Sequence, residues 1–185
     1  YKGTSVLVGP YQAPLYYVSP GQLVAQLPYE LPPNSSYPIL VVANNQITVP
    51  DEVDIVNVQP GVAQFPDASL IAQHGNFSLV TSSNPAKRNE FLIMYLVGLG
   101  LTSPSVASGA PSPGTPPLGV PIVQPQVFVG DTQAEVAFYG LTPSGVGLYQ
   151  INFKVPASAP LNTPLQVVVK QGEYTANVTT LTVAP

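Results

Sequence analysis

Proline content is the feature that most restricts what this chain can fold into. The 185 residues include 23 prolines, roughly 12 % of the chain, which is more than double the average share. Each proline fixes φ and removes a backbone N–H, so it breaks the interior of a helix and is excluded from the centre of a sheet. An all-helical fold is therefore ruled out, and helices are limited to short pieces.

The residues between the prolines favour β-structure throughout the chain. Short runs rich in Val, Ile, Tyr and Thr alternate with Pro, Gly and Asn, which is typical of a sandwich of many short strands. Within residues 149–155, Ile151, Phe153 and Val155 alternate with polar residues, as in a half-buried strand. Residues 103–125 are rich in Pro, Ser and Gly and are predicted to form a long surface loop. The predicted strands are residues 6–8, 15–18, 23–27, 39–43, 47–49, 53–58, 77–80, 91–98, 127–129, 135–139, 149–155, 165–169 and 175–183.

An internal repeat organises the chain. Short segments recur in the same order, with small loop insertions between them, which predicts two domains of one type. The matched segments are residues 6–9 and 127–130 (VLVG and VFVG), residues 12–13 and 133–134 (QA), Gln22 and Gln150, and residues 38–42 and 164–168 (PILVV and PLQVV).

The repeat divides the chain near Pro60 into two tandem β-sandwich domains, residues 1–59 and residues 60–185, which the resemblance described below implies to be Ig-like. Before its first shared strand the second copy has residues 60–126, whereas the first copy has only residues 1–5. The first sandwich is therefore predicted to lack its opening strands. The buried faces are predicted at Leu23, Ala25 and Leu27 in the first copy and at Ile151, Phe153 and Val155 in the second.

Four motifs resemble those of a known family. They are residues 14–22, 84–86, 95–100 and 147–152, with the sequences PLYYVSPGQ, NPA, YLVGLG and GLYQIN. On these motifs the chain resembles the Solibacter-type uncharacterised C-terminal domain family, and the likeness covers nearly the whole chain. The resemblance implies paired Ig-like sandwiches at the ends of large exported bacterial surface proteins, with no assigned chemistry. Two positions depart from the family pattern: Asn89 replaces a glycine, Asn being the next best residue for a left-handed turn, and Val24 replaces the asparagine of a Gln-x-Asn pattern.

Charge and residue inventory exclude several classes of function. Five basic and nine acidic residues give a net charge of −4, and the basic residues are too scattered for nucleic-acid binding. The chain has no cysteine, which removes disulfides, zinc–thiolate sites and thiol catalysis. The longest apolar run, residues 91–101, is shorter than the ~20 residues that cross a membrane, so no membrane insertion is expected. His74 is the only histidine and lies in a predicted exposed turn without triad partners; we expect no catalytic residue, metal or cofactor.

Three groups of residues have two interpretations each. Asp51, Glu52 and Asp54 form an acidic cluster; acids in a loop bind calcium, but no Asp-x-Asp-x-Asp-Gly loop follows, and acids at a strand edge deter aggregation. Ten tyrosines and six phenylalanines suit a sugar-stacking surface or a core, and their alternating strand positions favour the core. Gln22 and Gln150 are predicted to hydrogen-bond the backbone at a strand junction rather than to act in catalysis.

Two kinds of glycan site are predicted from short motifs and composition. Asn-x-Ser/Thr sequons begin at Asn34, Asn76 and Asn177, and in a secreted chain they mark surface turns. Residues 102–117 are rich in Ser, Thr and Pro and are a candidate for O-linked sugar.

Low charge, high proline content and the incomplete first sandwich favour a non-enzymatic extracellular structural protein of the cell surface. A sandwich that lacks a strand accepts one from a neighbour, so we expect copies of the chain to assemble head-to-tail into a filament. The alternative is a carbohydrate-binding or adhesive module, with glycans as partners, in a larger secreted surface protein. Because the chain opens with Tyr1 rather than Met, a processed or partial chain is expected. The tail at residues 175–184 is a second candidate donor, and the preferred donor strand consists of Tyr1, Lys2, Gly3, Thr4, Ser5, Val6, Leu7 and Val8.

Overall fold

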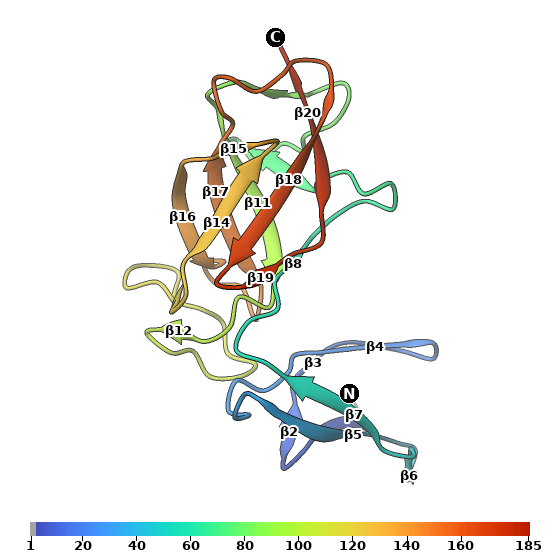
Figure 1. The fold of residues 1–185 in the computed structure, drawn as a ribbon. Coiled ribbons are helices and arrows are strands. Elements are labelled where there is room, and N and C mark those ends of the chain that lie inside the picture. The colour runs from blue at the N-terminus through green and yellow to red at the C-terminus, as the bar shows by residue number, and fades with distance from the viewer. Residues whose placement is uncertain (1–2) are drawn as a thin grey trace.

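The structure is a computed structural model that describes residues 3–185, and all of its regular elements are strands. The predicted all-β class is confirmed, and no helix within the described range is long and apolar enough to span a membrane. The strands form two groups, each with its own hydrophobic cluster. Figure 1 shows these groups as the N-terminal unit (residues 4–55, blue to teal) and the C-terminal sandwich (residues 61–184, which ends in red).

The C-terminal sandwich consists of two sheets that enclose one core. The first has the order β10-β20-β18-β14-β15, with β19 also paired to β18, and the second has the order β16-β17-β11-β8, with β9 also paired to β11. The first sheet contains β10 (Ala86–Lys87), β14 (Pro125–Val129), β15 (Thr132–Gln133), β18 (Pro164–Gln171), β19 (Tyr174–Thr175) and β20 (Thr179–Ala184). The second contains β8 (Gly61–Val62), β9 (Ala72–His74), β11 (Phe91–Val97), β16 (Val136–Leu141) and β17 (Tyr149–Lys154). The core combines buried side chains of both sheets, among them Leu92, Met94, Ile151, Phe153, Val127, Val167, Val169, Leu181 and Val183.

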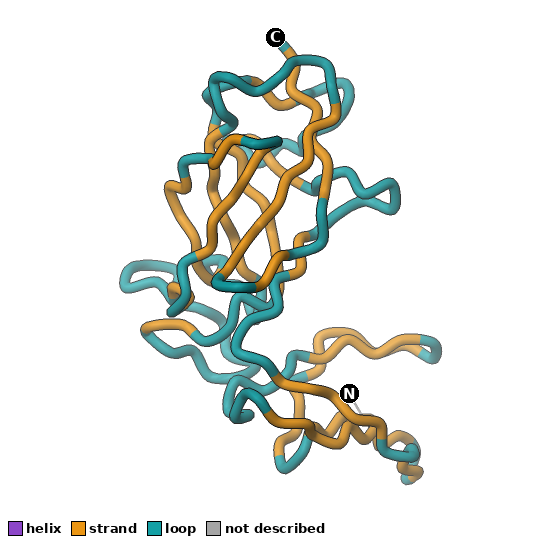
Figure 2. Tube along the Cα trace, viewed as in Figure 1, coloured by secondary structure: helices purple, strands orange, loops and turns teal. Residues whose placement is uncertain are grey.

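The N-terminal unit has one sheet and one separate hairpin. The sheet has the order β2-β1-β5-β6, with β7 also paired to β5, and the hairpin joins β3 to β4. In Figure 2 the hairpin projects to one side of the unit. The strands are β1 (Thr4–Val8), β2 (Tyr11–Ala13), β3 (Leu15–Ser19), β4 (Gln22–Ala25), β5 (Ser35–Ala43), β6 (Gln46–Ile47) and β7 (Asp51–Ile55). Its cluster of buried residues is small: Val6, Val8, Ala13 and Leu31.

The seven strands of the N-terminal unit repeat seven strands of the C-terminal sandwich. β1 to β7 correspond in order to β14 to β20, because the same pairs form: β1 with β2 and β5, β5 with β6 and β7, and β3 with β4. Both hairpins also carry a bulge at the same place, after Leu15 in β3 and after Val136 in β16. Strands equivalent to β8, β9, β10 and β11 are absent from residues 3–60.

The register of the sheets corrects one part of the sequence alignment. Val8 pairs with Ile39, and Val129, the counterpart of Val8, pairs with Val167. Ile39 therefore corresponds to Val167, whereas alignment of the PILVV and PLQVV segments matches it with Leu165. The alignment is wrong by two residues. The hydrophobic pattern does not reveal such an error, because a shift of two residues keeps every side chain on the same face of the sheet.

The predicted buried face exists in one copy only. Ile151, Phe153 and Val155 are fully buried, as predicted. Their counterparts differ: Leu23 is half-buried, and Ala25 and Leu27 are exposed, so the prediction is wrong for the first copy. The reason is that β11 lies beside β17 in the C-terminal sandwich, while no strand of the described chain lies at the equivalent position beside β4.

Two other segments differ from their predictions. Residues 77–80 form no named strand; the strand is β9, which pairs with β11, and Phe77 follows in a turn with a φ of +66°. Residues 103–125 are largely exposed, but they include part of a short ribbon of β12 (Thr102–Ser103) and β13 (Val120–Pro121).

The YLVGLG motif is explained by the junction between the two units. The Gln59 N–H donates to the Gly98 carbonyl at 2.9 Å. A Cβ on Gly98 would lie 2.0 Å from the Gln59 carbonyl oxygen, and one on Gly100 would lie 2.3 Å from that of Asn57. Both glycines also have a φ near +80°, which disfavours a side chain. The two glycines therefore let the connecting segment pass directly against the C-terminal sandwich.

Candidate functional site

The hairpin leaves one side of β4 unpaired. β4 pairs with β3 and with no other strand within residues 3–185. The Gln26 N–H donates to the Pro14 carbonyl on the β3 side at 2.9 Å. Because the direction of the amides alternates along a strand, the amides of Leu23, Ala25 and Leu27 point away from β3. We call this side of the hairpin, with these three residues, the open edge.

The C-terminal sandwich shows what occupies such an edge. β17, the counterpart of β4, pairs with β16 on one side and with β11 on the other. The Val155 N–H donates to the Glu90 carbonyl, and the Val155 carbonyl accepts from the Asn89 amide, both at 2.9 Å. Asn89 has a φ of +65°, which confirms its predicted left-handed turn. Leu27 holds the position of Val155 and has no such backbone partner within residues 3–185.

Apolar and uncharged residues surround the open edge. Leu27 is 46 % exposed, and on the rest of the hairpin Tyr16 is 62 % and Tyr17 49 % exposed. Residues 14–27 contain no charged residue. Full burial of one leucine contributes about 2 kcal/mol, so the hairpin forgoes several kcal/mol of burial that its counterpart in the C-terminal sandwich obtains.

A second free edge of the N-terminal unit, that of β7, carries charge. β7 pairs only with β5 among the described strands, whereas its counterpart β20 also pairs with β10. Asp51, Glu52 and Asp54 are exposed on β7, and the Ser36 hydroxyl donates to the Asp54 carboxylate. Charged side chains on an edge strand oppose pairing with another chain, which fits the edge interpretation of these acids. Residues 3–185 contain no group of three or more His, Cys, Asp or Glu side chains placed to hold a metal ion.

The donor segments predicted from the sequence are paired within their own chain. Thr4–Val8 is β1, which lies between β2 and β5 with Val6 and Val8 buried. Tyr1 and Lys2 lie outside the described residues. The tail Thr179–Ala184 is β20, which lies between β10 and β18. Neither β1 nor β20 is therefore a free donor strand, because its backbone groups and apolar side chains are already used.

His74 lies in a partly buried contact and not in the predicted exposed turn. It ends β9, and its side chain is 13 % exposed. Its Nδ1 lies 3.1 Å from Glu90 Oε2 and its Nε2 lies 3.2 Å from the Asn84 carbonyl oxygen. The Glu90 carboxylate also accepts from the Lys87 amide. His74 thus ties the hairpin after β9 to the start of β11, and sequence reasoning missed this because the partners lie in separate turns.

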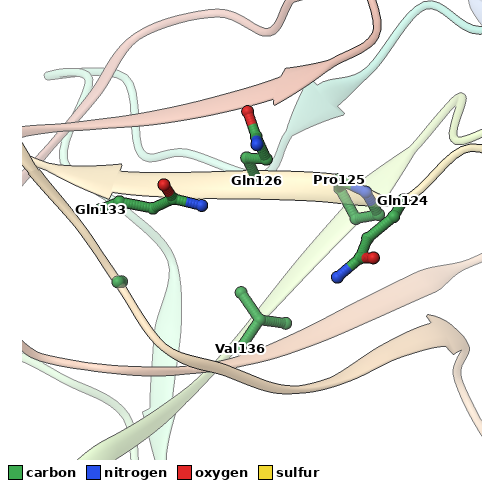
Figure 3. Close-up of a pocket in the computed structure, with 6 residues that line it drawn as sticks. Gln124, Pro125, Gln126, Gln133 and Val136 are labelled. Carbon is green, nitrogen blue, oxygen red and sulfur yellow. The ribbon is translucent and has the colours of Figure 1, made fainter.

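A small pocket lies beside β14, β15 and β16 (Figure 3). Its volume is about 230 Å³, and Figure 3 shows Gln124 and Gln133 extending towards one another from opposite sides. No aromatic residue lines it, so it offers amide groups but no stacking surface for a sugar. The lining residues are Gln124, Pro125, Gln126, Gln133, Ala134 and Val136.

The predictions for the aromatic residues and for the two repeated glutamines are wrong. Only Tyr149 and Phe153 among the aromatic residues of the described chain are buried, because most of the others lie on outer strand faces or in turns. The Gln150 amide donates to the Asn152 side chain at 2.8 Å and not to the backbone. The Gln22 side chain is exposed and makes no hydrogen bond within residues 3–185.

Residues 103–125 connect the two units through Ser108. The Ser108 hydroxyl donates to the Glu30 carboxylate at 2.6 Å and accepts from the Tyr29 amide at 2.7 Å. The hydrogen bond from Ser108 lowers the pKa of Glu30 below its ordinary value. The Tyr29 hydroxyl lies 3.3 Å from that of Tyr149, whose pKa is raised by burial and by the Tyr29 hydroxyl. These contacts hold the segment that follows the open edge against the C-terminal sandwich.

The three sequons lie in different environments. Asn34 is exposed, and Asn76 is exposed with its Oδ1 accepting two hydrogen bonds inside its own turn. The Asn177 Oδ1 accepts from the Val62 amide at 2.7 Å, and its Nδ2 donates to the Val62 carbonyl and the Gln64 side chain at 3.0 and 2.7 Å. Asn177 therefore holds β8 in place, and its amide nitrogen is already engaged.

Several hydroxyls of the candidate O-glycan segment are also engaged. Thr102 is buried and donates to the Pro104 carbonyl at 2.9 Å. Ser112 is buried and donates to the Thr142 carbonyl at 2.5 Å. Together with Ser108, these residues serve internal contacts and do not present free hydroxyls.

No protein-family model, curated protein or solved structure matches this chain.

Proposed function

We propose that this chain is a non-enzymatic structural module that joins a neighbouring polypeptide by β-strand addition at the open edge. One observation carries the proposal: Ala25 and Leu27 are exposed where their counterparts, Phe153 and Val155, are fully buried. Strand addition uses unpaired backbone groups for affinity and uncovered side-chain positions for specificity, and the open edge offers both.

The contrast between the free edges of β4 and β7 supports the same function. β7 carries three acidic residues, whereas residues 14–27 carry no charge. Proteins protect exposed edge strands with charges, prolines or bulges, or they cover them. β4 itself contains none of these devices, which favours coverage of this edge in the functional state.

The extracellular setting and the assembly are further parts of the proposal. The setting is supported by the motifs that resemble a family of exported surface proteins and by the low charge of the chain. A filament of identical chains needs a donor strand, and both predicted donors, β1 and β20, are paired within the chain. The proposal therefore places the added strand outside residues 3–185.

The alternative function, carbohydrate binding or adhesion, is favoured by one observation. Tyr11, Tyr16 and Tyr17 are exposed on β2 and β3, and aromatic rings are suited to contacts with a partner surface. The glutamine-lined pocket does not add to this alternative, because no aromatic residue lines it.

Light scattering on the purified chain tests the proposed function. We expect particle mass to rise above that of the monomer as concentration increases, because an uncovered apolar edge associates. Leu27→Lys places a charge at the open edge and should suppress this association. Val49→Lys is the matched control, because Val49 is apolar, 88 % exposed and outside the hairpin. A wild-type chain that stays monomeric at every soluble concentration and also binds no added strand peptide would contradict the proposal, as would a Leu27→Lys chain that associates like the wild type.

A further inference from the structure

We infer that the open edge accepts an uncharged strand of the β11 type, antiparallel to β4, from a polypeptide segment outside residues 3–185. The inference rests on the proposed function and adds the direction, the register and the side-chain chemistry of the partner strand. The observations that carry it come from the second copy of the repeat, in which the same edge is filled.

The direction and register follow from β17. β11 runs antiparallel to β17, with Leu92 opposite Phe153 and Met94 opposite Ile151. The shared bulge fixes the correspondence of β4 with β17, so Ala25 holds the position of Phe153 and Leu23 that of Ile151. The partner strand therefore places one residue opposite Ala25 and, two residues later, another opposite Leu23.

The side-chain chemistry follows from β11 as well. Leu92 and Met94 are fully buried and Leu96 is 1 % exposed, because they fill the space between the two sheets. The same alternation on a partner strand would cover the partly buried Val41 and Val53, which lie on the inner side of the N-terminal sheet. A charged side chain at these positions would be buried without a partner, which is costly, and no charged residue lies within residues 14–27.

The strands of this chain are themselves occupied. β11 lies inside its own sheet, between β17 on one side and β8 and β9 on the other. A second copy could lend β11 only by opening its own core around Leu92 and Met94. Since β1 and β20 are also paired on both sides, a strand from a separate segment is the occupant that leaves both folds intact.

A peptide in trans tests the inference on the full chain. The probe is a fluorescent peptide of the β11 sequence, FLIMYLV, with lysines added beyond its ends for solubility. We expect saturable binding by anisotropy and slower hydrogen exchange at the amides of Leu23, Ala25 and Leu27. The amides of Val24 and Gln26 should change little, because they already face β3. A matched peptide with serine in place of the second, fourth and sixth residues should bind at least about tenfold more weakly, since each buried leucine contributes more than 1 kcal/mol.

Ala25→Pro is the variant that separates the open edge from the rest of the hairpin. The Ala25 N–H points away from β3, so proline removes no hydrogen bond of the hairpin but removes a donor that the partner strand needs. Binding of the peptide should fall about tenfold or more. Ala25→Val keeps the N–H and is the control for altered side-chain size. A hairpin that retains slow exchange at Val24 and Gln26 in Ala25→Pro shows that the variant has folded.

The outcomes distinguish this inference from the proposed function. Equal binding of the serine peptide, unchanged binding to Ala25→Pro, or protection outside the open edge would overturn the inference. If Leu27→Lys suppresses self-association and the peptide does not dissociate the associated wild-type chains, a second copy occupies the open edge. The proposed function then stands and the inference falls. If the chain neither self-associates nor binds the peptide, both fall.

Discussion

Ile151 and Leu23 occupy the same place in the two copies of the repeat, so one perturbation can be made twice. Replacement of either residue by alanine removes three carbon atoms. Ile151 is fully buried in the core of the C-terminal sandwich, whereas Leu23 is half-buried beside the open edge. The loss of three buried carbons corresponds to about 2.5 kcal/mol of transfer free energy, and the cavity left behind raises the loss for Ile151→Ala to about 3–4 kcal/mol. For Leu23→Ala we expect about 1 kcal/mol, because half of the side chain already contacts solvent and the site can relax.

Urea unfolding followed by the amide signals of β17 and of β4 measures the two losses separately. Separate probes are needed because a chain with two hydrophobic clusters need not unfold in one step. For an m-value of about 1.5 kcal/mol/M, Ile151→Ala should lower the midpoint of the C-terminal sandwich by about 2 M. A loss of about 3 kcal/mol or more for Leu23→Ala, equal to that for Ile151→Ala, would show that β4 is covered in the isolated chain and would refute the reasoning behind the open edge. Addition of a bound partner strand should raise the cost of Leu23→Ala towards that of Ile151→Ala.

Three further predictions concern contacts elsewhere in the fold. Asn177→Ala removes two side-chain hydrogen bonds to Val62 in β8 and one to the Gln64 side chain. It should therefore lower the free energy of unfolding by about 2 kcal/mol and speed amide exchange in β8; unchanged exchange there would contradict this role. Gly98→Ala places a Cβ 2.0 Å from a carbonyl oxygen at a φ of +78°, so it should lower the free energy of unfolding by about 3 kcal/mol or more in thermal unfolding. The control is Gly130→Ala, which has nothing within 4 Å of its Cβ and should cost about 1 kcal/mol from its positive φ alone. Equal losses for the two variants would argue against the close contact at Gly98. The Ser108 hydroxyl lowers the pKa of Glu30, so the ionised Glu30 stabilises the folded state at neutral pH. This contribution is lost as the pH falls below about 4.5 and through the lowered pKa. Ser108→Ala should therefore cost more stability at about pH 6 than at about pH 3 in urea unfolding, and an equal cost at both pH values would contradict the hydrogen bond from Ser108 to Glu30.

The candidate site was visible in the sequence only in part. The repeat and the short segment before its first copy indicated that the first sandwich lacks strands. The alternation of Leu23, Ala25 and Leu27 predicts a buried face, and the structure differs because alternation tells which residues share a face and not whether anything covers it. The sequence also did not show that part of the preferred donor segment, Thr4–Val8, is paired on both sides within its own chain, with Val6 and Val8 buried.

The sequence by itself determined the all-β class and the repeat. Proline density limits helices through bonds within a few residues of each proline, and the period of two at Ile151 and Phe153 reflects the pleat of a single strand. The proline constraint and the pleat are local properties, because each depends on residues that are close together in the chain, and the repeat follows from comparing two parts of the sequence without any knowledge of their contacts.

Only the tertiary structure decided which faces are covered and which strand edges are filled. Leu27 and Val155 belong to the same motif, but Val155 is buried because the segment from Glu90 onward pairs beside it, and no described segment does so for Leu27. The contact of His74 with Glu90 and the bonds from Asn177 to Val62 likewise join separate elements. Burial and register depend on which distant segment lies alongside a strand, and the residues of the strand itself do not carry that information.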